Sequence, residues 1–208
     1  MISKFQVDHN NWDLKDADFL ENNRVVTITE RKLSIWNVAT KKPLFEKDAP
    51  FDPADYKTVV AITEEKFVIG TNKGSLVVEY TTEMIENEED PFVIKKISTQ
   101  AEQILRITDQ VFAFAYSKLA LVDMTTYDEI FSVNTSGYFK ALCLFADNVL
   151  MAAEREDVSF FEISDKSNRL KLLKKIAVDD QPIVISRASK SSLVCGYNYK
   201  GFSVIKIK

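Results

Sequence analysis

Short apolar runs separated by a few polar residues follow one another along most of the chain. Examples are RVVTIT at residues 24–29, KFVIGT at 66–71 and SLVCGY at 192–197. Runs of 4–8 residues rich in β-branched and aromatic side chains, bounded by turn-forming residues, are typical of β-strands. The pattern therefore predicts an all-β protein built from many short strands.

The ends of these predicted strands recur at a nearly fixed period. Aligning endings in which apolar residues lead into a polar position gives five anchors, at Asn37, Glu79, Asp123, Glu162 and Lys206. The spacings are 42, 44, 39 and 44 residues. A period of about 40 to 45 residues is typical of propeller blades. Two further apolar runs precede each anchor strand and a fourth follows in all but the last unit, which predicts a repeated four-stranded meander.

The repeat divides one domain, residues 1–208, into five blades and a closing strand. The blades are expected at residues 14–47, 55–98, 101–133, 139–177 and 182–208. The fifth has three strands, and folded proteins avoid unpaired strand edges. Residues 3–8, SKFQVD, alternate in polarity and have the length of a missing strand, so we expect them to close the last blade. The alternative is that the five units belong to a larger propeller completed by a partner chain.

The strand pattern, the period and the pair Trp36-Asn37 resemble the WD-repeat β-propeller family over essentially the whole chain. The resemblance implies about five four-stranded blades and an interaction scaffold. No unit carries the Gly-His dipeptide typical of that family, and His9 is the only histidine. The Asp-His tetrad that ties a typical blade is therefore missing. An irregular β-sandwich or barrel is the alternative fold, because both also contain many short, evenly spaced strands.

Composition narrows the function classes. Of 208 residues, 46% are hydrophobic and 28% charged, and the net charge is -4. This balance is ordinary for a soluble domain and provides no general attraction for nucleic acid. No signal-peptide pattern or membrane-spanning run is found. Cys143 and Cys195 lie in apolar runs, which favours buried thiols. We expect a cytoplasmic protein, with the nucleus as the alternative.

Candidate chemistry is sparse. Nucleophilic catalysis by a triad needs a base beside the nucleophile, and His9 has no adjacent Ser or Cys. GTNKGS, residues 70–75, lacks the spacing of a phosphate-binding loop and indicates a hairpin turn. The cysteines and His9 show no metal-ligand spacing. We expect no catalytic residues, no metal and no cofactor. The alternative is a glycan-acting or other hydrolase with channel carboxylates, for which EREDV, residues 154–158, supplies acids.

Cationic residues occur in the turn that links the second and third strands of every predicted unit. They are Arg31, Lys32, Lys73, Lys118, Arg155 and Lys200. In a closed propeller these turns surround one mouth of the channel. Their summed potential would attract an acidic or phosphorylated peptide. The alternative is that they are ordinary solvated turns, with Glu30, Glu154 and Glu156 cancelling part of the charge.

Loops between successive units are expected on the same face and carry large aromatic residues. These are Trp12, Phe51, Tyr56 and Tyr138. Aromatic side chains beside cations are typical of interface hot spots, which predicts that they bind a partner. The alternative is that each fills the packing between neighbouring units.

Two charged segments lie away from these turns. The acidic insertion TTEMIENEEDP, residues 81–91, predicts a loop or a helical turn that a basic partner could dock on. The basic stretch KSNRLKLLKK, residues 166–175, could contact acidic lipid or protein, and lipid ranks lower because the paired-arginine motif of lipid-binding propellers is missing. The sequence as a whole favours a non-catalytic adaptor subunit of a multi-subunit complex with protein or peptide partners.

Overall fold

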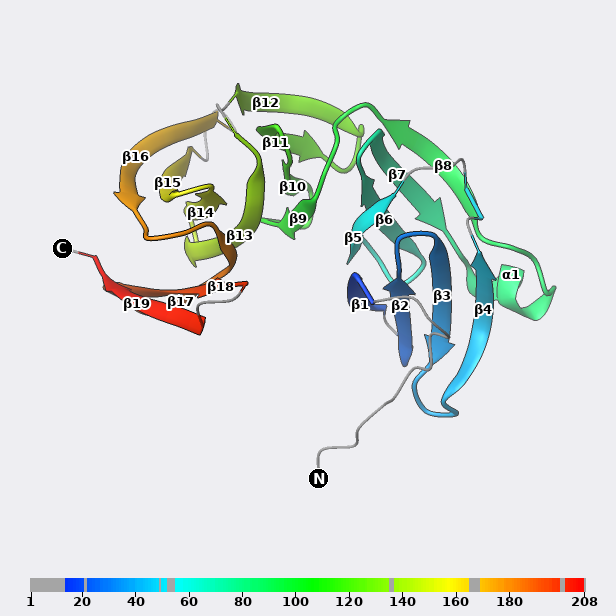
Figure 1. Cartoon of the computed structure of the whole chain (residues 1–208). Coiled ribbons are helices and arrows are strands. Elements are labelled where there is room, and N and C mark those ends of the chain that lie inside the picture. Colours follow the sequence, from blue (N-terminus) through cyan, green and yellow to red (C-terminus); the bar gives the residue numbers. More distant parts are fainter. Residues whose placement is uncertain are drawn as a thin grey trace. The chain divides into compact units, whose positions relative to one another are not determined.

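The computed structural model describes residues 14–20, 22–48, 50–51, 55–134, 137–164, 169–198 and 201–207. Within these residues the chain forms five separate antiparallel sheets, four of four strands and one of three (Figure 1). The prediction of an all-β fold with five repeated sheets is confirmed. The predicted closing strand at residues 3–8, together with Trp12 and Lys200, lies outside the described residues. The chain divides into two compact units, residues 1–101 and 102–208.

Unit 1 contains two sheets and one short helix. The first sheet consists of β1 (Asp16–Leu20), β2 (Arg24–Ile28), β3 (Lys32–Asn37) and β4 (Lys42–Asp48). The second consists of β5 (Tyr56–Ala61), β6 (Lys66–Thr71), β7 (Gly74–Glu79) and β8 (Phe92–Ile97), with α1 (Thr82–Glu86) between its last two strands. In both sheets each strand pairs with the next along the chain.

Unit 2 contains three sheets of the same kind. The third sheet consists of β9 (Gln103–Arg106), β10 (Val111–Ala115), β11 (Lys118–Asp123) and β12 (Asp128–Asn134). The fourth consists of β13 (Phe139–Ala146), β14 (Val149–Glu154), β15 (Asp157–Ser164) and β16 (Arg169–Ala177). The fifth consists of β17 (Pro182–Ser189), β18 (Ser192–Tyr197) and β19 (Gly201–Lys206).

A β-bulge recurs at the equivalent position of four sheets. It lies between the third and fourth strands, at Ile35/Trp36, Val77/Val78, Leu121/Val122 and Phe160/Phe161. Each bulge begins two residues before an anchor position of the sequence repeat. Bulges sharpen the local twist of a strand and are designed features of a fold. The sequence repeat therefore coincides with a repeated feature of the backbone, the bulge beside each of these four anchor positions.

In the four sheets of four strands, burial is highest in the second and third strands and lowest in the fourth. All five residues of β2 are buried, whereas Phe45 is the buried residue of β4. Strands that are apolar on both faces need a covering layer on each side. Core clusters accordingly combine neighbouring sheets within each unit: Val26 and Ile35 with Phe67 and Ile69 in unit 1, and Ala113 and Leu121 with Leu150 and Phe161 in unit 2.

Polar contacts at the sheet margins reinforce this packing. The Asp16 carboxylate accepts hydrogen bonds from Thr58 Oγ1 at 2.6 Å and Val59 N at 3.0 Å, and Asp18 accepts one from Ala61 N at 2.8 Å. These contacts join β1 to β5. They connect the first two sheets by side chains other than an Asp-His pair.

Arg24 makes the most buried of these connections in unit 1. Its side chain is 3% exposed. Nη2 donates to the carbonyl of Glu64 at 2.7 Å, and Nη1 donates to that of Tyr80 at 3.2 Å. The charged side chain of Arg24 on β2 thus satisfies one backbone carbonyl just before β6 and one just after β7.

The acidic insertion at residues 81–91, predicted to be a loop or a helical turn, contains the short helix α1. The Thr81 side chain caps α1 by accepting from Met84 N at 3.1 Å, and Met84 is buried in the core of unit 1. Capping and one buried anchor fix this short helix. In the described part of the chain no helix has the length and apolar character needed to span a membrane.

We predict that Arg24→Met lowers the free energy of unfolding by about 2 to 4 kcal/mol, because it leaves buried carbonyls without their charged donor. The matched control is Lys47→Met in the same unit. Lys47 pairs with Asp90 at 2.7 Å but is 55% exposed, so its loss should cost no more than about 0.5 kcal/mol. Urea unfolding measures both. Equal effects would show that the Arg24 hydrogen bonds add nothing to stability.

Candidate functional site

Two hairpin turns and one connecting loop meet at one end of the third and fourth sheets. Phe139 N donates to the Tyr116 carbonyl at 2.8 Å, and the rings of Tyr116 and Tyr138 lie 5.0 Å apart. We call the group of Tyr116, Lys118, Gly137, Tyr138 and Arg155 the turn face of unit 2. Because strands fix the turns, these side chains are held in place without a partner.

Arg155 occupies a strained position on this face. Glu154 and Asp157 pair across a two-residue turn, and Arg155 is its first residue with φ of 28°. Positive φ at the first central position of such a turn normally requires glycine. Strain of this kind is often retained at functional sites. Arg155 is exposed, so burial does not explain why a large cation stands here.

Gly137 makes room for the charged residues around it. A Cβ at this position would lie 3.2 Å from Glu154 Oε1 and 3.4 Å from Arg155 Nε. The first of these distances is shorter than most Cβ contacts, and the second is an ordinary van der Waals contact. The absence of a side chain therefore lets the Arg155 side chain lie over the loop that also carries Tyr138.

The other cations of the predicted ring differ in exposure and in whether a neighbouring carboxylate offsets their charge. Lys32 is half-buried and pairs with Glu46 at 2.6 Å, and Lys118 pairs with Glu129. Arg31 and Lys73 are exposed in the hairpin turns of unit 1. Carboxylates on β4 and β12 thus offset two of the cations. The predicted ring of six cations extends over both units and stays a prediction.

The aromatic residues predicted to contact a partner differ in how far they are exposed. Tyr138 is 48% exposed, whereas Phe51 is half-buried against the core of unit 1. Tyr56 is 1% exposed, and its hydroxyl accepts from Phe51 N at 3.4 Å. Burial raises the pKa of the Tyr56 hydroxyl. The prediction that Tyr56 offers contact area to a partner is wrong, because Tyr56 begins β5 with its ring in the core.

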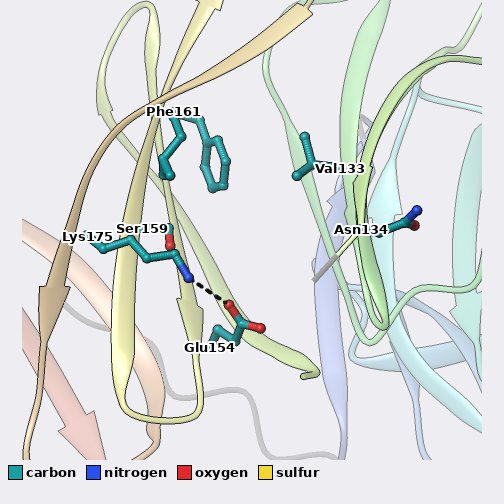
Figure 2. A pocket seen from close by; sticks show the side chains of 7 residues that line it. Val133, Asn134, Glu154, Ser159, Phe161 and Lys175 are labelled. Carbon is teal, nitrogen blue, oxygen red and sulfur yellow. Dashed lines mark ion pairs between the residues drawn. The ribbon is translucent and has the colours of Figure 1, made fainter. Parts of the chain in front are cut away.

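A pocket of about 240 Å³ lies between the third and fourth sheets, next to the turn face (Figure 2). Val133, Phe161 and Leu172 supply apolar walls, and Glu154, Ser159 and Lys175 supply polar groups. Glu154 is 5% exposed. Its Oε2 lies 3.5 Å from Lys175 Nζ. Within the part of the chain that the structure describes, Oε1 of Glu154 and Oγ of Ser159 have no hydrogen-bond partner.

This pocket was missed by the sequence reasoning, which treated Glu154 as one of several acids in a solvated turn. The only available signal was its place as the last residue of the buried run VLMAAE. The described residues that line the pocket include one carboxylate, whereas glycoside hydrolysis uses two. Among the described residues, no group of three or more His, Cys, Asp or Glu side chains could hold a metal ion.

Comparison with solved structures identifies the fold. The chain superimposes on the WD40 repeats of RRP9 with a TM-score of 0.71 and 12% identity, over 94% of this chain and 67% of that one. It superimposes on U3-55K with a TM-score of 0.69 and 12% identity, over 93% of this chain and 68% of that one. With the β-propeller domain of Cps50 (Swd1) from Myceliophteria thermophila the TM-score is 0.74 and the identity 13%, over 93% of this chain and 70% of that one. The chain thus has a WD40-type β-propeller architecture.

Sequence comparison adds no family assignment. No family model matches the chain, and no curated protein does. At 12–13% identity the solved structures show the fold alone.

Replacing Arg155 by glycine should raise the free energy of unfolding by about 1 kcal/mol, since glycine adopts the positive φ of this turn without strain. The matched control is Glu156→Gly, the other turn residue, which does not have positive φ. That change should lower stability by about 0.5 to 1 kcal/mol through backbone entropy. Thermal and urea unfolding of both variants measure the difference. A destabilised Arg155→Gly protein would contradict the strain argument.

Proposed function

From this WD40-type propeller architecture, we propose that the protein is a non-catalytic interaction scaffold, acting as an adaptor or subunit of a complex. The turn face of unit 2 is the observation that carries the proposal. There an exposed tyrosine, Tyr138, follows Gly137, and a Cβ at Gly137 would lie 3.4 Å from Nε of the exposed and strained Arg155. Tyrosine and arginine are enriched among the residues that dominate binding energy at protein interfaces.

The chemistry of this face favours an acidic or phosphorylated peptide segment. Arg155 presents a planar guanidinium with five donors, which matches a carboxylate or phosphate bidentately. Lys118 on the neighbouring hairpin adds a positive charge that Glu129 shares. The tyrosine pair supplies apolar contact area beside these cations. A partner segment would therefore combine an acidic group with an apolar neighbour.

Quantitative affinity purification from extract of the source cells tests this proposal. The bait Arg155→Glu/Tyr138→Ser should lose its partners at least about tenfold, because each of these side chains is of hot-spot type. Lys190→Glu is the matched control, since Lys190 is an exposed cation of unit 2 in the turn between β17 and β18, outside the proposed recognition surfaces. It should retain the same partners. Partners retained by the double variant would refute the turn face as the recognition surface.

Phosphatase treatment of the extract, done in parallel, separates the two acidic chemistries. Loss of partners after treatment indicates a phosphorylated segment, and retention indicates carboxylates.

A second candidate function is a partial propeller completed by a partner chain. The fifth sheet buries Ile185, Leu193 and Cys195 on one face. On its other face, Val184, Phe202 and Val204 are 58%, 73% and 57% exposed. Register places Phe202 beside Gly196 and Val204 beside Val194, so the exposed apolar residues of β19 share one face. A contiguous apolar face of this kind is typical of an interaction surface.

The solved structures are longer than this chain. The chain covers 67–70% of their lengths with five sheets. The remaining third corresponds to about two further sheets of the same size. A blade supplied by another protein would cover the apolar face of the fifth sheet.

The bait Phe202→Ser/Val204→Thr tests this candidate. It should lose the completing partner at least about tenfold while keeping the partners that depend on Arg155 and Tyr138. The free protein should change in stability by no more than about 0.5 kcal/mol, because both side chains are exposed. A loss of about 2 kcal/mol or more would instead show that the chain covers this face itself.

A further inference from the structure

Glu154 places an incompletely paired carboxylate inside unit 2. The residue is 5% exposed, and Oε1 has no hydrogen-bond partner among the described residues. Ser159, 1% exposed on the adjacent strand, has an Oγ atom that also makes no hydrogen bond to any described residue. Buried polar groups without partners cost free energy and are rare in native proteins. Two such groups line the same pocket, where a ligand or ordered water can supply the missing partners.

Lys175 compensates the carboxylate only in part. Its Nζ lies 3.5 Å from Glu154 Oε2 and 3.9 Å from Asp157 Oδ2, and its side chain is 46% exposed. Figure 2 shows the lysine reaching one oxygen of Glu154 while the other oxygen points away from it. Ion pairs of this length on an exposed side chain contribute little. The carboxylate therefore keeps the capacity to bind a second cation.

The rest of the pocket suits an aliphatic stem that ends in a planar cation. Val133 and Phe161 face each other from the third and fourth sheets (Figure 2), and Leu172 on β16 adds a third apolar wall. The volume of about 240 Å³ is close to the lower limit for small-ligand pockets and accommodates one long side chain. Long cationic side chains bury their methylene groups on apolar surface while the charged head finds a partner.

We propose that this pocket binds the guanidinium of an arginine side chain from a protein partner. Guanidinium is less strongly hydrated than an ammonium group and carries several donors in one plane. It can donate to Glu154 Oε1 and Ser159 Oγ together, whereas a lysine would repeat the contact that Lys175 already makes. The inference rests on the proposed scaffold function and deepens it, because the recognised segment then carries an arginine close to the acidic group that Arg155 binds.

A probe titration tests the pocket without knowledge of the partner. The full chain is titrated with N-acetyl-arginine N-methylamide, and amide chemical shifts are followed by NMR. Shifts are expected at Gly137, Ser159 and Phe161. The citrulline analogue has nearly the same shape but no charge, and it should bind at least tenfold more weakly. Equal binding of the two analogues, or shifts that avoid the pocket, would overturn the proposal, since water alone would then satisfy the carboxylate.

Three variants make the test specific. Glu154→Gln preserves shape, removes the charge and should weaken the arginine probe at least tenfold. Glu162→Gln is the matched control on the same sheet, since Glu162 is 42% exposed and pairs with Lys171, and it should bind the probe like wild type. Lys175→Ala removes the cation that competes with the probe for Glu154, and this variant should bind the arginine probe severalfold more tightly than wild type. A purely structural role of Glu154 and Lys175 would not produce opposite changes in affinity.

A failure to fold does not leave the inference undecided. If Glu154→Gln melts at a lower temperature than the titration requires, Ser159→Ala replaces it and should weaken the probe severalfold. Unchanged binding in that variant would count against the proposal. Because the probe assay uses purified protein, its failure is separate from a failure of the turn-face purification, which depends on Arg155 and Tyr138.

Discussion

Two-sided burial of the central strands is the constraint on which the rest of the molecule depends. Strands such as β2 and β10 are buried on both faces, so each sheet needs a neighbour packed against it. Fully burying a large apolar side chain such as valine or phenylalanine is favourable by about 1.5 to 3 kcal/mol. Polar contacts such as those of Arg24 and Asp16 lie at the margins of this packing and fix how one sheet meets the next.

Stacking of sheets decides where chemistry can occur. The central strands use their side chains to cover one another, so the groups available for recognition lie in turns and loops and on exposed outer strands such as β19. Rigid strands on either side allow a turn to hold an unfavourable backbone, as at Arg155. They also allow a void to persist where two sheets separate near their ends, and the pocket beside Glu154 lies there.

Local features of the sequence were sufficient to predict the strands, the repeat and the five sheets, because alternation and turn residues act within a few positions. Features that depend on the neighbouring strand or sheet were not predictable. Tyr56 looked like a loop aromatic, but its ring is buried by packing on other strands of unit 1. Lys32 looked like a free cation, but the register of β3 and β4 brings Glu46 to its diagonal position.

Glu154 is the clearest example of this limit, and it also explains how one turn can present two opposite charges. Successive residues of a strand point to opposite sides, so at the end of β14 the carboxylate of Glu154 turns into the pocket. Arg155 is the next residue, and the turn directs its guanidinium to solvent. From sequence alone, the two form an acid-base pair that any solvated hairpin could carry. In the folded chain both side chains reach the neighbourhood of Gly137, but they differ in exposure: Glu154 is buried and Arg155 is exposed. A partner segment that carries both an acid and an arginine would therefore be recognised in a single register, because exchanging the two charges would place like charges together at both positions.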